Sequence, residues 1–201
     1  MQAKRLTSTS GQLMQGPLLL TTRLFGDERG FFLESWNQRT FAAALEADGQ
    51  PVPDFVQDNH SRSSQGVLRG LHYQLPPHPQ GKLVRCVLGE IFDVAVDIRK
   101  GSATSGQWVG ARLSAANYQQ LWVPAGFAHG FLTLSEHAEV LYKTTDFWSC
   151  DCERAIRWDD PQLAVGWPTL EGAAAPTAPL LSEKDGVAPL LANLSDQDLF
   201  R

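Results

Sequence analysis

The chain has 201 residues, 43% of them hydrophobic, and carries a formal net charge of -5. This length fits one domain with one sizeable core, and the negative charge argues against nucleic acid or an anionic membrane as a partner, since both require a basic surface. No run of about 18 apolar residues is present, and Met1–Gly16 lacks the apolar core of a signal peptide. We therefore expect a single cytoplasmic domain over residues 1–201, with a core from about 18 to 185 and a tail from 186 to 201.

The first predicted elements are a turn, an aromatic strand and a helix. Residues 26–30, with glycine at both ends, indicate a turn that leads into a strand over Phe31–Trp36. Thr40–Ala47 is rich in alanine and leucine and is the best helix candidate in the chain. Beyond Pro53, runs of Val, Ile, Leu and aromatic residues alternate with Gly and Pro at short intervals. This pattern predicts an all-β barrel or sandwich.

The clearest local unit is Lys82–Arg99, in which two apolar runs flank Gly89-Glu90. A glycine at the first central position favours a two-residue hairpin turn. The hairpin register predicts three facing pairs: Leu88 with Ile91, Cys86 with Asp93, and Lys82 with Asp97. The even positions 82–88 would then share a face with the odd positions 91–97, so that Lys82 and Asp93 point the same way and could line a cavity.

The C-terminal region begins with an Ala- and Pro-rich stretch, residues 172–179, which predicts a linker to a tail over Leu180–Arg201. The chain has three cysteines, an odd number. Cys150 and Cys152 lack the second ligand pair that a zinc ribbon requires, so we expect free thiols.

Histidines are the first candidates for chemistry. His72 lies between an apolar run and a proline-rich loop, and His129 lies in a later apolar run. Metal-binding barrels of the cupin type commonly supply two histidines two residues apart, a carboxylate and a third histidine, whereas this chain offers half of that set. Arg69 could form an anion site with His72 only if Gly70 carries a bulge, because residues three apart on a straight strand face opposite ways.

Aromatic and serine residues leave several interpretations open. Tyr142 could be an interior acid or an ordinary strand aromatic, and Phe147-Trp148 could stack on a base or fill core. Ser61, near His60, lacks the strand-turn-helix elbow of a serine hydrolase.

Eight segments, in one order along the chain, together resemble the dTDP-4-dehydrorhamnose 3,5-epimerase family. They are 27–34 (DERGFFLE), 57–61 (QDNHS), 68–74 with 80–82 (LRGLHYQ and QGK), 92–94 (FDV), 124–131 (PAGFAHGF), 141–146 (LYKTTD), 157–161 (RWDDP) and 181–185 (LSEKD). The resemblance implies a cupin-like jelly-roll β-barrel with short peripheral helices. It also implies an isomerase of dTDP-L-rhamnose biosynthesis that needs no metal and no cofactor.

The resemblance further implies the roles of individual residues. His72 corresponds to the general base and Asp185 to its orienting carboxylate. Tyr142 corresponds to the acid on the opposite face of the sugar, and Lys82 to the group that stabilises the enolate. The residues assigned to binding the dTDP-sugar are Arg29, Glu34, Gln57, Asp58, Asn59, Arg69, His129, Trp148, Glu153 and Lys184.

Two further expectations follow from the family. Its members often carry a Tyr-Tyr pair where this chain has Phe147-Trp148, and the second tyrosine of that pair stacks on thymine. Trp148 still offers a ring for stacking, but this ring differs in size from that of tyrosine. The family pairs barrels by sheet extension, which implies a homodimer in which the apolar strand Phe31–Trp36 is covered.

Three other functions compete with this one. A single-centre epimerase, acting at carbon 3 or carbon 5 alone, would use much the same site. A non-catalytic barrel that binds sugar nucleotides would not need a base, an acid and an enolate partner together. A metal-dependent cupin oxygenase or isomerase would need the missing ligands.

Overall fold

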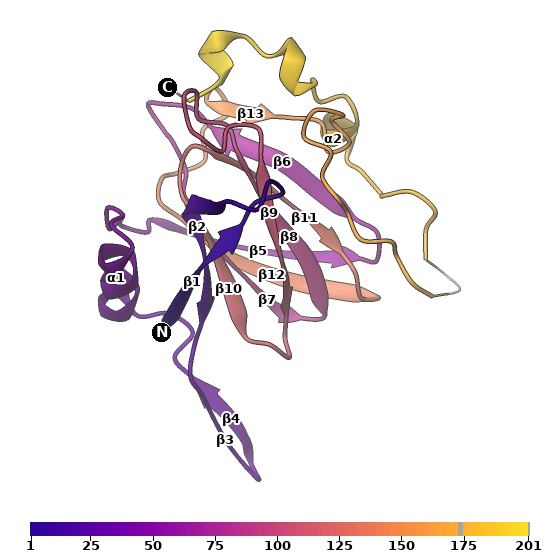
Figure 1. Cartoon of the computed structure of the whole chain (residues 1–201). Coiled ribbons are helices and arrows are strands. Elements are labelled where there is room, and N and C mark those ends of the chain that lie inside the picture. The colour runs from indigo at the N-terminus through magenta and orange to yellow at the C-terminus, as the bar shows by residue number, and fades with distance from the viewer. Residues whose placement is uncertain (173–174, 201) are drawn as a thin grey trace.

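A computed structural model describes residues 1–172 and 175–200 of the chain. Two antiparallel sheets face each other and form a jelly-roll barrel, which confirms the predicted all-β class (Figure 1). The larger sheet has the order β1 (Gln2–Thr7), β2 (Leu13–Thr21), β10 (Gln119–Val123), β7 (Lys82–Leu88), β12 (His137–Thr144) and β5 (Gln57–Ser64). The smaller sheet has the order β13 (Glu153–Ala155), β6 (Leu68–Gln74), β11 (Phe127–Thr133), β8 (Glu90–Asp97) and β9 (Trp108–Ser114).

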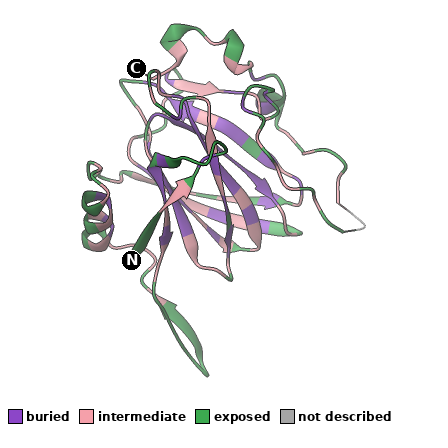
Figure 2. Ribbon diagram, viewed as in Figure 1, coloured by how far each residue is buried: buried purple, intermediate pink, exposed green. Residues whose placement is uncertain are grey.

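The main core fills the space between the two sheets. Both sheets send alternate side chains inward, and Figure 2 shows that buried residues concentrate in the facing strands. Examples are Val84 of β7, Ala95 of β8, Leu121 of β10 and Val140 of β12.

Helix α1 (Gln38–Ala47) confirms the predicted helix and begins two residues earlier than expected. The cause is Asn37, whose side-chain oxygen accepts hydrogen bonds from the backbone N–H groups of Arg39 and Thr40. The helix buries Phe41 and Leu45 against the outer face of the larger sheet, beside Trp122.

The predicted hairpin is wrong, although both of its strands form. β7 pairs with β10 and β12, whereas β8 pairs with β11 and β9, so the chain crosses from one sheet to the other at Gly89. Gly89 has a φ of +73°, and a Cβ there would lie 2.0 Å from the carbonyl oxygen of His137. The predicted pairs are replaced by others, such as Cys86 with Val140 and Asp93 with Phe131.

The predicted sharing of a face by the two runs is nevertheless confirmed. Val84 and Cys86 from β7 pack in the same interior core as Ile91 and Ala95 from β8. Because both faces of each run are apolar, each strand can be central in its own sheet, and the two strands meet face to face instead of edge to edge.

The aromatic strand is shorter than expected. β4 (Gly30–Leu33) stops before Trp36 and pairs with β3 (Leu24–Asp27), so the two form an arm that projects from the barrel (Figure 1). Trp36 leaves the strand because its ring packs edge-on against Phe55, with ring centroids 5.8 Å apart. Phe32 on the arm is 69% exposed.

The C-terminal tail packs on the outer face of the smaller sheet. This part of the tail follows α2 (Glu183–Gly186) and contains two 3₁₀ turns, Leu191–Asn193 and Asp196–Asp198. The hydroxyl of Tyr73 donates to the carbonyl oxygen of Asp198 at 2.8 Å, and Leu191 and Phe200 pack on the core of that face. Residues 173 and 174 of the predicted linker, and residue 201 of the predicted tail, lie outside the described residues.

Two further observations concern the whole described chain. The three cysteines are unpaired, as expected. Neither helix within residues 1–172 and 175–200 has the length and hydropathy needed to cross a membrane.

Candidate active site

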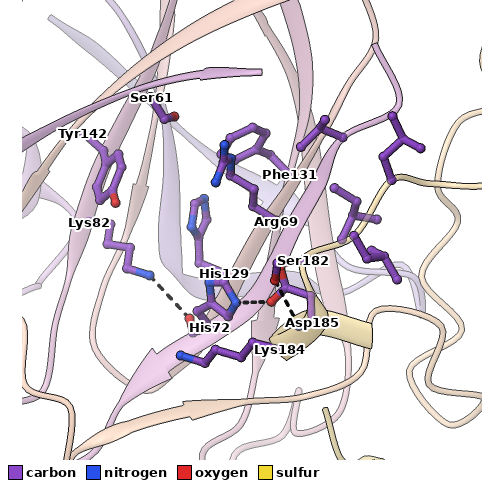
Figure 3. A pocket seen from close by; sticks show the side chains of 14 residues that line it. Ser61, Arg69, His72, Lys82, His129, Phe131, Tyr142, Ser182, Lys184 and Asp185 are labelled. Atoms are coloured by element: carbon purple, nitrogen blue, oxygen red, sulfur yellow. Dashed lines mark hydrogen bonds and ion pairs between the residues drawn. The ribbon is translucent and has the colours of Figure 1, made fainter. Parts of the chain in front are cut away.

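A cavity of about 450 Å³ opens between the two sheets (Figure 3). β6 and β11 of the smaller sheet form one wall, β5, β7 and β12 of the larger sheet form the other, and the segment before and within α2 closes a third side. Its lining residues are Ser61, Val67, Leu68, Arg69, His72, Lys82, His129, Phe131, Tyr142, Leu180, Leu181, Ser182, Lys184 and Asp185.

His72 and Asp185 form a hydrogen-bonded dyad in this cavity. Nε2 of His72 donates to Oδ1 of Asp185 at 2.5 Å. The backbone of Asp185 is fixed by a hydrogen bond, because its N–H donates to the hydroxyl of Ser182, the N-cap of α2. Burial raises the pKa of Asp185, but the hydrogen bonds from His72, Ser182 and the backbone of Gly70 outweigh it and hold that pKa below its usual range. Asp185 therefore stays ionised and can stabilise a protonated His72.

A β-bulge brings Arg69 and His72 to the same cavity. β6 pairs His72 with His129 and Arg69 with Phe131, so two residues of β6 oppose the single residue Gly130 of β11. At Gly70 the φ is +130° and a Cβ would lie 2.5 Å from Cα of Gly130. Gly70 thus carries the bulge that the sequence left open as a possibility, and Nε of Arg69 donates to the hydroxyl of Ser63 at 3.1 Å.

Lys82 reaches the cavity from the larger sheet. Its Nζ donates to the carbonyl oxygen of His72 at 3.5 Å (Figure 3). Burial lowers the pKa of Lys82 to about 8, against the opposing charges of Asp93 and Glu153. At neutral pH the group is thus still a cation, in a desolvated place where a cation acts strongly on a developing negative charge.

Tyr142 lies across the cavity from His72 (Figure 3). It belongs to β12 of the larger sheet, whereas His72 belongs to β6 of the smaller sheet. The pKa of Tyr142 is raised, mainly by burial; the charge of Arg69 lowers it and the charge of Glu153 raises it further. The phenol therefore stays protonated at neutral pH. A proton acceptor and a proton donor therefore face the same space from opposite sides.

Four predicted substrate contacts gather beside the cavity, near Lys184. Gln57 and Asn59 lie on the inward face of β5 and share a hydrogen bond of 3.0 Å, and Gln57 also accepts from the backbone of Trp148. Glu153 pairs with Lys184 at 2.5 Å and accepts a hydrogen bond from the Trp148 side chain. Trp148 itself is 58% exposed, so its ring is open to a ligand.

The remaining three predicted contacts lie elsewhere in the single chain. Asp58 points to the outer face of β5, because neighbouring strand residues alternate, and it pairs there with Lys143 at 3.0 Å. Arg29 lies at the tip of the arm with its side chain 86% exposed, paired with Asp27, and Glu34 follows the arm and accepts from Asn37. Arg29 and Glu34 are not among the residues that line the cavity within the described chain.

Comparison with known proteins decides the family. Residues 12–193 match the family model described as dTDP-4-dehydrorhamnose 3,5-epimerase. The chain belongs to this family of epimerases. A dTDP-4-dehydrorhamnose 3,5-epimerase of Pseudomonas aeruginosa is 64% identical over 183 residues, which are 91% of this chain and 93% of that protein.

Solved structures of epimerases agree with this family. The enzyme of Legionella pneumophila, in complex with dTDP-4-keto-L-rhamnose, is similar with a TM-score of 0.86 and 44% identity, covering 100% of this chain and 98% of that one. The enzyme of Bacillus anthracis, with TDP and pyrophosphate bound, is similar with a TM-score of 0.79 and 44% identity, covering 94% of this chain and 100% of that one.

Sequence reasoning missed several lining residues of this epimerase. Ser61 follows Asn59 by two positions on β5, and Phe131 follows His129 by two on β11, so the alternation of a strand was the signal that could have found them. Ser182 could have been found as the N-cap of the helix that carries Asp185.

The number of candidate ligands in the sequence disfavours a metal site. Within residues 1–172 and 175–200, no three His, Cys, Asp or Glu side chains gather closely enough to hold a metal ion. That the epimerase needs neither metal nor cofactor remains a prediction.

Proposed function

We propose that this chain is a dTDP-4-dehydrorhamnose 3,5-epimerase, which converts dTDP-4-dehydro-6-deoxy-D-glucose to dTDP-4-dehydro-L-rhamnose. The observation that carries the proposal is the placement of His72 and Tyr142 on opposite walls of one cavity, with Lys82 between them. A stereocentre beside a ketone is inverted when a base removes its proton from one face and an acid returns a proton to the other.

The base step is assigned to His72. Its Nε2–H is engaged by Asp185, which leaves Nδ1 to accept the proton from carbon 3 or carbon 5 of the sugar. The electrons of the broken C–H bond move onto the oxygen of the carbon-4 ketone and form an enolate. The ammonium group of Lys82 stabilises that oxygen, and the carboxylate of Asp185 stabilises the imidazolium.

The acid step is assigned to Tyr142. The phenol gives its proton to the opposite face of the same carbon, which restores the ketone and leaves the carbon inverted. Substrate and product have the same composition and oxidation state, so the balance requires no redox partner. The imidazolium and the phenolate return to their starting forms by proton exchange before the second carbon reacts.

Binding of the nucleotide is assigned to the cavity and its rim. Arg69 lines the cavity as a cation for the diphosphate, and Trp148 offers an open ring for the thymine. His129, Lys184, Glu153, Gln57 and Asn59 are proposed as the remaining contacts within the chain. Under this assignment the sugar would occupy the cavity and the base would lie outside it.

The experiment that tests the function is product analysis by NMR. Incubation with dTDP-4-dehydro-6-deoxyglucose in D₂O should yield dTDP-4-dehydro-L-rhamnose with deuterium at carbons 3 and 5. Exchange at one carbon alone would assign a single-centre epimerase instead. No exchange at either carbon would leave a barrel that only binds the sugar nucleotide.

A homodimer is proposed as the assembly. The projecting arm carries exposed aromatic rings, among them Phe25 and Phe32, and a two-stranded arm of this kind is poorly stable without cover. A second copy would cover it and would receive Arg29 and Glu34 near its own site. In light scattering we expect twice the monomer mass of 22.1 kDa.

Two variants test the role of the arm. Phe32→Lys should shift the protein toward the monomer mass, whereas Leu13→Lys, which alters a side chain of comparable exposure on β2 (60% against 69%), should not. A monomeric wild-type protein at micromolar concentration would contradict the dimer.

The cytoplasm is proposed as the compartment, because unpaired cysteines persist where thiols are kept reduced.

A further inference from the structure

Gln74 is a buried polar side chain at the end of β6. Its exposed fraction is 2%, and it is not among the residues that line the cavity in the described chain. Gln74 follows His72 by two positions, so both side chains leave the same face of the strand. A buried amide is unfavourable unless its donors and its acceptor are bonded. The partners of Gln74 therefore indicate its role.

All three hydrogen-bond partners of Gln74 are backbone groups. Nε2 donates to the carbonyl oxygen of His78 at 2.7 Å and to that of Phe147 at 3.2 Å. Oε1 accepts from the backbone N–H of Ser149 at 2.8 Å. The amide thus uses both of its N–H groups and its oxygen. A rotation of the amide by half a turn would place Oε1 against carbonyl oxygens, so the three partners select one orientation.

Two of these hydrogen bonds lie on either side of Trp148. The carbonyl group of Phe147 belongs to the peptide group before Trp148, and the N–H of Ser149 belongs to the peptide group after it. Because peptide groups are planar, fixing both of them fixes φ and ψ of the residue between them, and with these angles the direction of its Cα–Cβ bond. Gln74 therefore sets the direction in which the indole leaves the backbone.

Trp148 has few other constraints. Residues 147–149 lie outside every helix and strand of the described chain, and Trp148 is 58% exposed, so burial contributes little to holding it. Its backbone N–H donates to Oε1 of Gln57 at 3.3 Å, and its side chain donates to Glu153. The hydrogen bonds from Gln74 are the ones that join this segment to the central part of the smaller sheet.

We propose that Gln74 is a positioning residue for the nucleotide, which ties the stacking residue Trp148 to the strand that carries His72. The inference rests on the proposed function, since Trp148 is assigned there to the thymine. Two positions along a strand span about 7 Å, so the platform for the base keeps a constant distance from the residue that acts on the sugar. A platform that is already ordered does not have to be immobilised when the ligand binds, which favours binding.

The test compares two glutamines that bind backbone groups. Gln74→Met keeps the length of the side chain and removes its three hydrogen bonds. Gln65→Met is the matched control, because Nε2 of Gln65 also donates to two carbonyl oxygens, those of Leu134 and Glu171, at 2.8 and 3.0 Å, and both lie outside the segment 147–149. Both variants are made in the wild-type protein and in Trp148→Ala, so that a double-mutant cycle measures the coupling. The dissociation constant of dTDP, measured by titration calorimetry, reports binding without requiring turnover.

The expected result is a loss of affinity that depends on Trp148. Gln74→Met should raise the dissociation constant of dTDP about two- to twelvefold, as expected when one side chain has to be immobilised on binding. In the Trp148→Ala background the same change should have an effect of less than about twofold, because the group that Gln74 positions is gone. KM for the dTDP-sugar should rise with the dissociation constant, and kcat should change less. Gln65→Met should leave the dissociation constant in place in both backgrounds, even if it lowers the melting temperature.

Two results would overturn the inference. One is an unchanged dissociation constant in a folded Gln74→Met, and the other is an equal loss of affinity with and without the indole of Trp148. If Gln74→Met does not fold, amide hydrogen exchange of the wild-type protein decides. The N–H of Ser149 should exchange slowly although it lies outside any strand, whereas fast exchange would show that Gln74 does not hold the segment.

Failure of the two hypotheses can be told apart. Coupling between Gln74 and Trp148 in a wild type that binds dTDP but does not epimerise counts against the proposed function alone. Wild-type turnover together with additive effects in the cycle counts against Gln74 alone. An unchanged dissociation constant in Trp148→Ala counts against Gln74 and against the thymine assignment together, because the thymine then lies elsewhere.

Discussion

The carboxylate of Asp185 and the imidazole of His72 are joined by a hydrogen bond of 2.5 Å, although 113 positions separate the two residues in the chain. His72 is fixed by a central strand of the smaller sheet, and Asp185 is fixed by a four-residue helix in the C-terminal segment. The site is therefore complete only when the segment after residue 175 is in place. Its chemistry can be tested residue by residue.

Replacing the base should abolish turnover and spare the fold. His72→Ala removes the proton acceptor, and a proton-transfer group of this kind contributes ~10²- to 10⁴-fold in rate. Tyr142→Phe should cause a loss of the same order, because only the phenol proton is removed. The control is His60→Ala, which removes an exposed histidine paired with Glu139 on the outer face of β5. Near-wild-type kcat in His72→Ala would contradict its assignment as base.

Activity should fall on the alkaline side of about pH 8. The pKa of Lys82 is lowered to about 8 by burial, so its ammonium is lost as pH rises through that value, and only the ammonium can stabilise the enolate. Lys82→Arg should reduce kcat, because the guanidinium has another shape, but should remove the alkaline fall, because it keeps its charge. An alkaline limb that is the same in Lys82→Arg would show that another group titrates.

Gly70→Ala should disturb the bulge that turns His72 and Arg69 into the cavity. The added Cβ would lie 2.5 Å from Cα of Gly130 at a φ of +130°, so the strand must shift. We expect a destabilisation of roughly 1–3 kcal/mol together with a loss of kcat. Gly101→Ala is the control, since its φ of +76° carries backbone strain but its Cβ would meet nothing within 4 Å. Measurements of the melting temperature and of kcat should distinguish the two variants, with activity preserved only in Gly101→Ala.

Trp148→Ala should weaken substrate binding more than turnover. Stacking of a base on an aromatic side chain contributes roughly 1–3 kcal/mol, so we expect KM to rise about five- to a hundredfold. The effect on kcat should be smaller, because stacking is similar in the ground state and the transition state. dTDP should also quench tryptophan fluorescence, and the quench should vanish in Trp148→Phe but persist in Trp108→Phe, whose ring packs on Phe92. An unchanged KM would place the thymine elsewhere.

The local pattern of the sequence determined the strands and much of the site. Alternation and turn residues located β7 and β8 and placed Lys82 on the same side as Asp93, and the spacing of Arg69 and His72 raised the possibility of a bulge at Gly70. These features depend on neighbours within a few residues, where side-chain direction is set by backbone geometry. The identities of the candidate base, acid and cation came from motifs that resemble a known family.

Only the tertiary structure decided which strands pair. β7 and β8 follow each other in the chain but lie in different sheets, because a run that is apolar on both faces pairs equally well with several partners and packing between the sheets selects among them. The same packing set Asp58 outside the barrel, left the arm with Arg29 away from its own cavity, and brought Asp185 to His72. Contacts between distant segments depend on the burial of the whole core, which no local pattern contains.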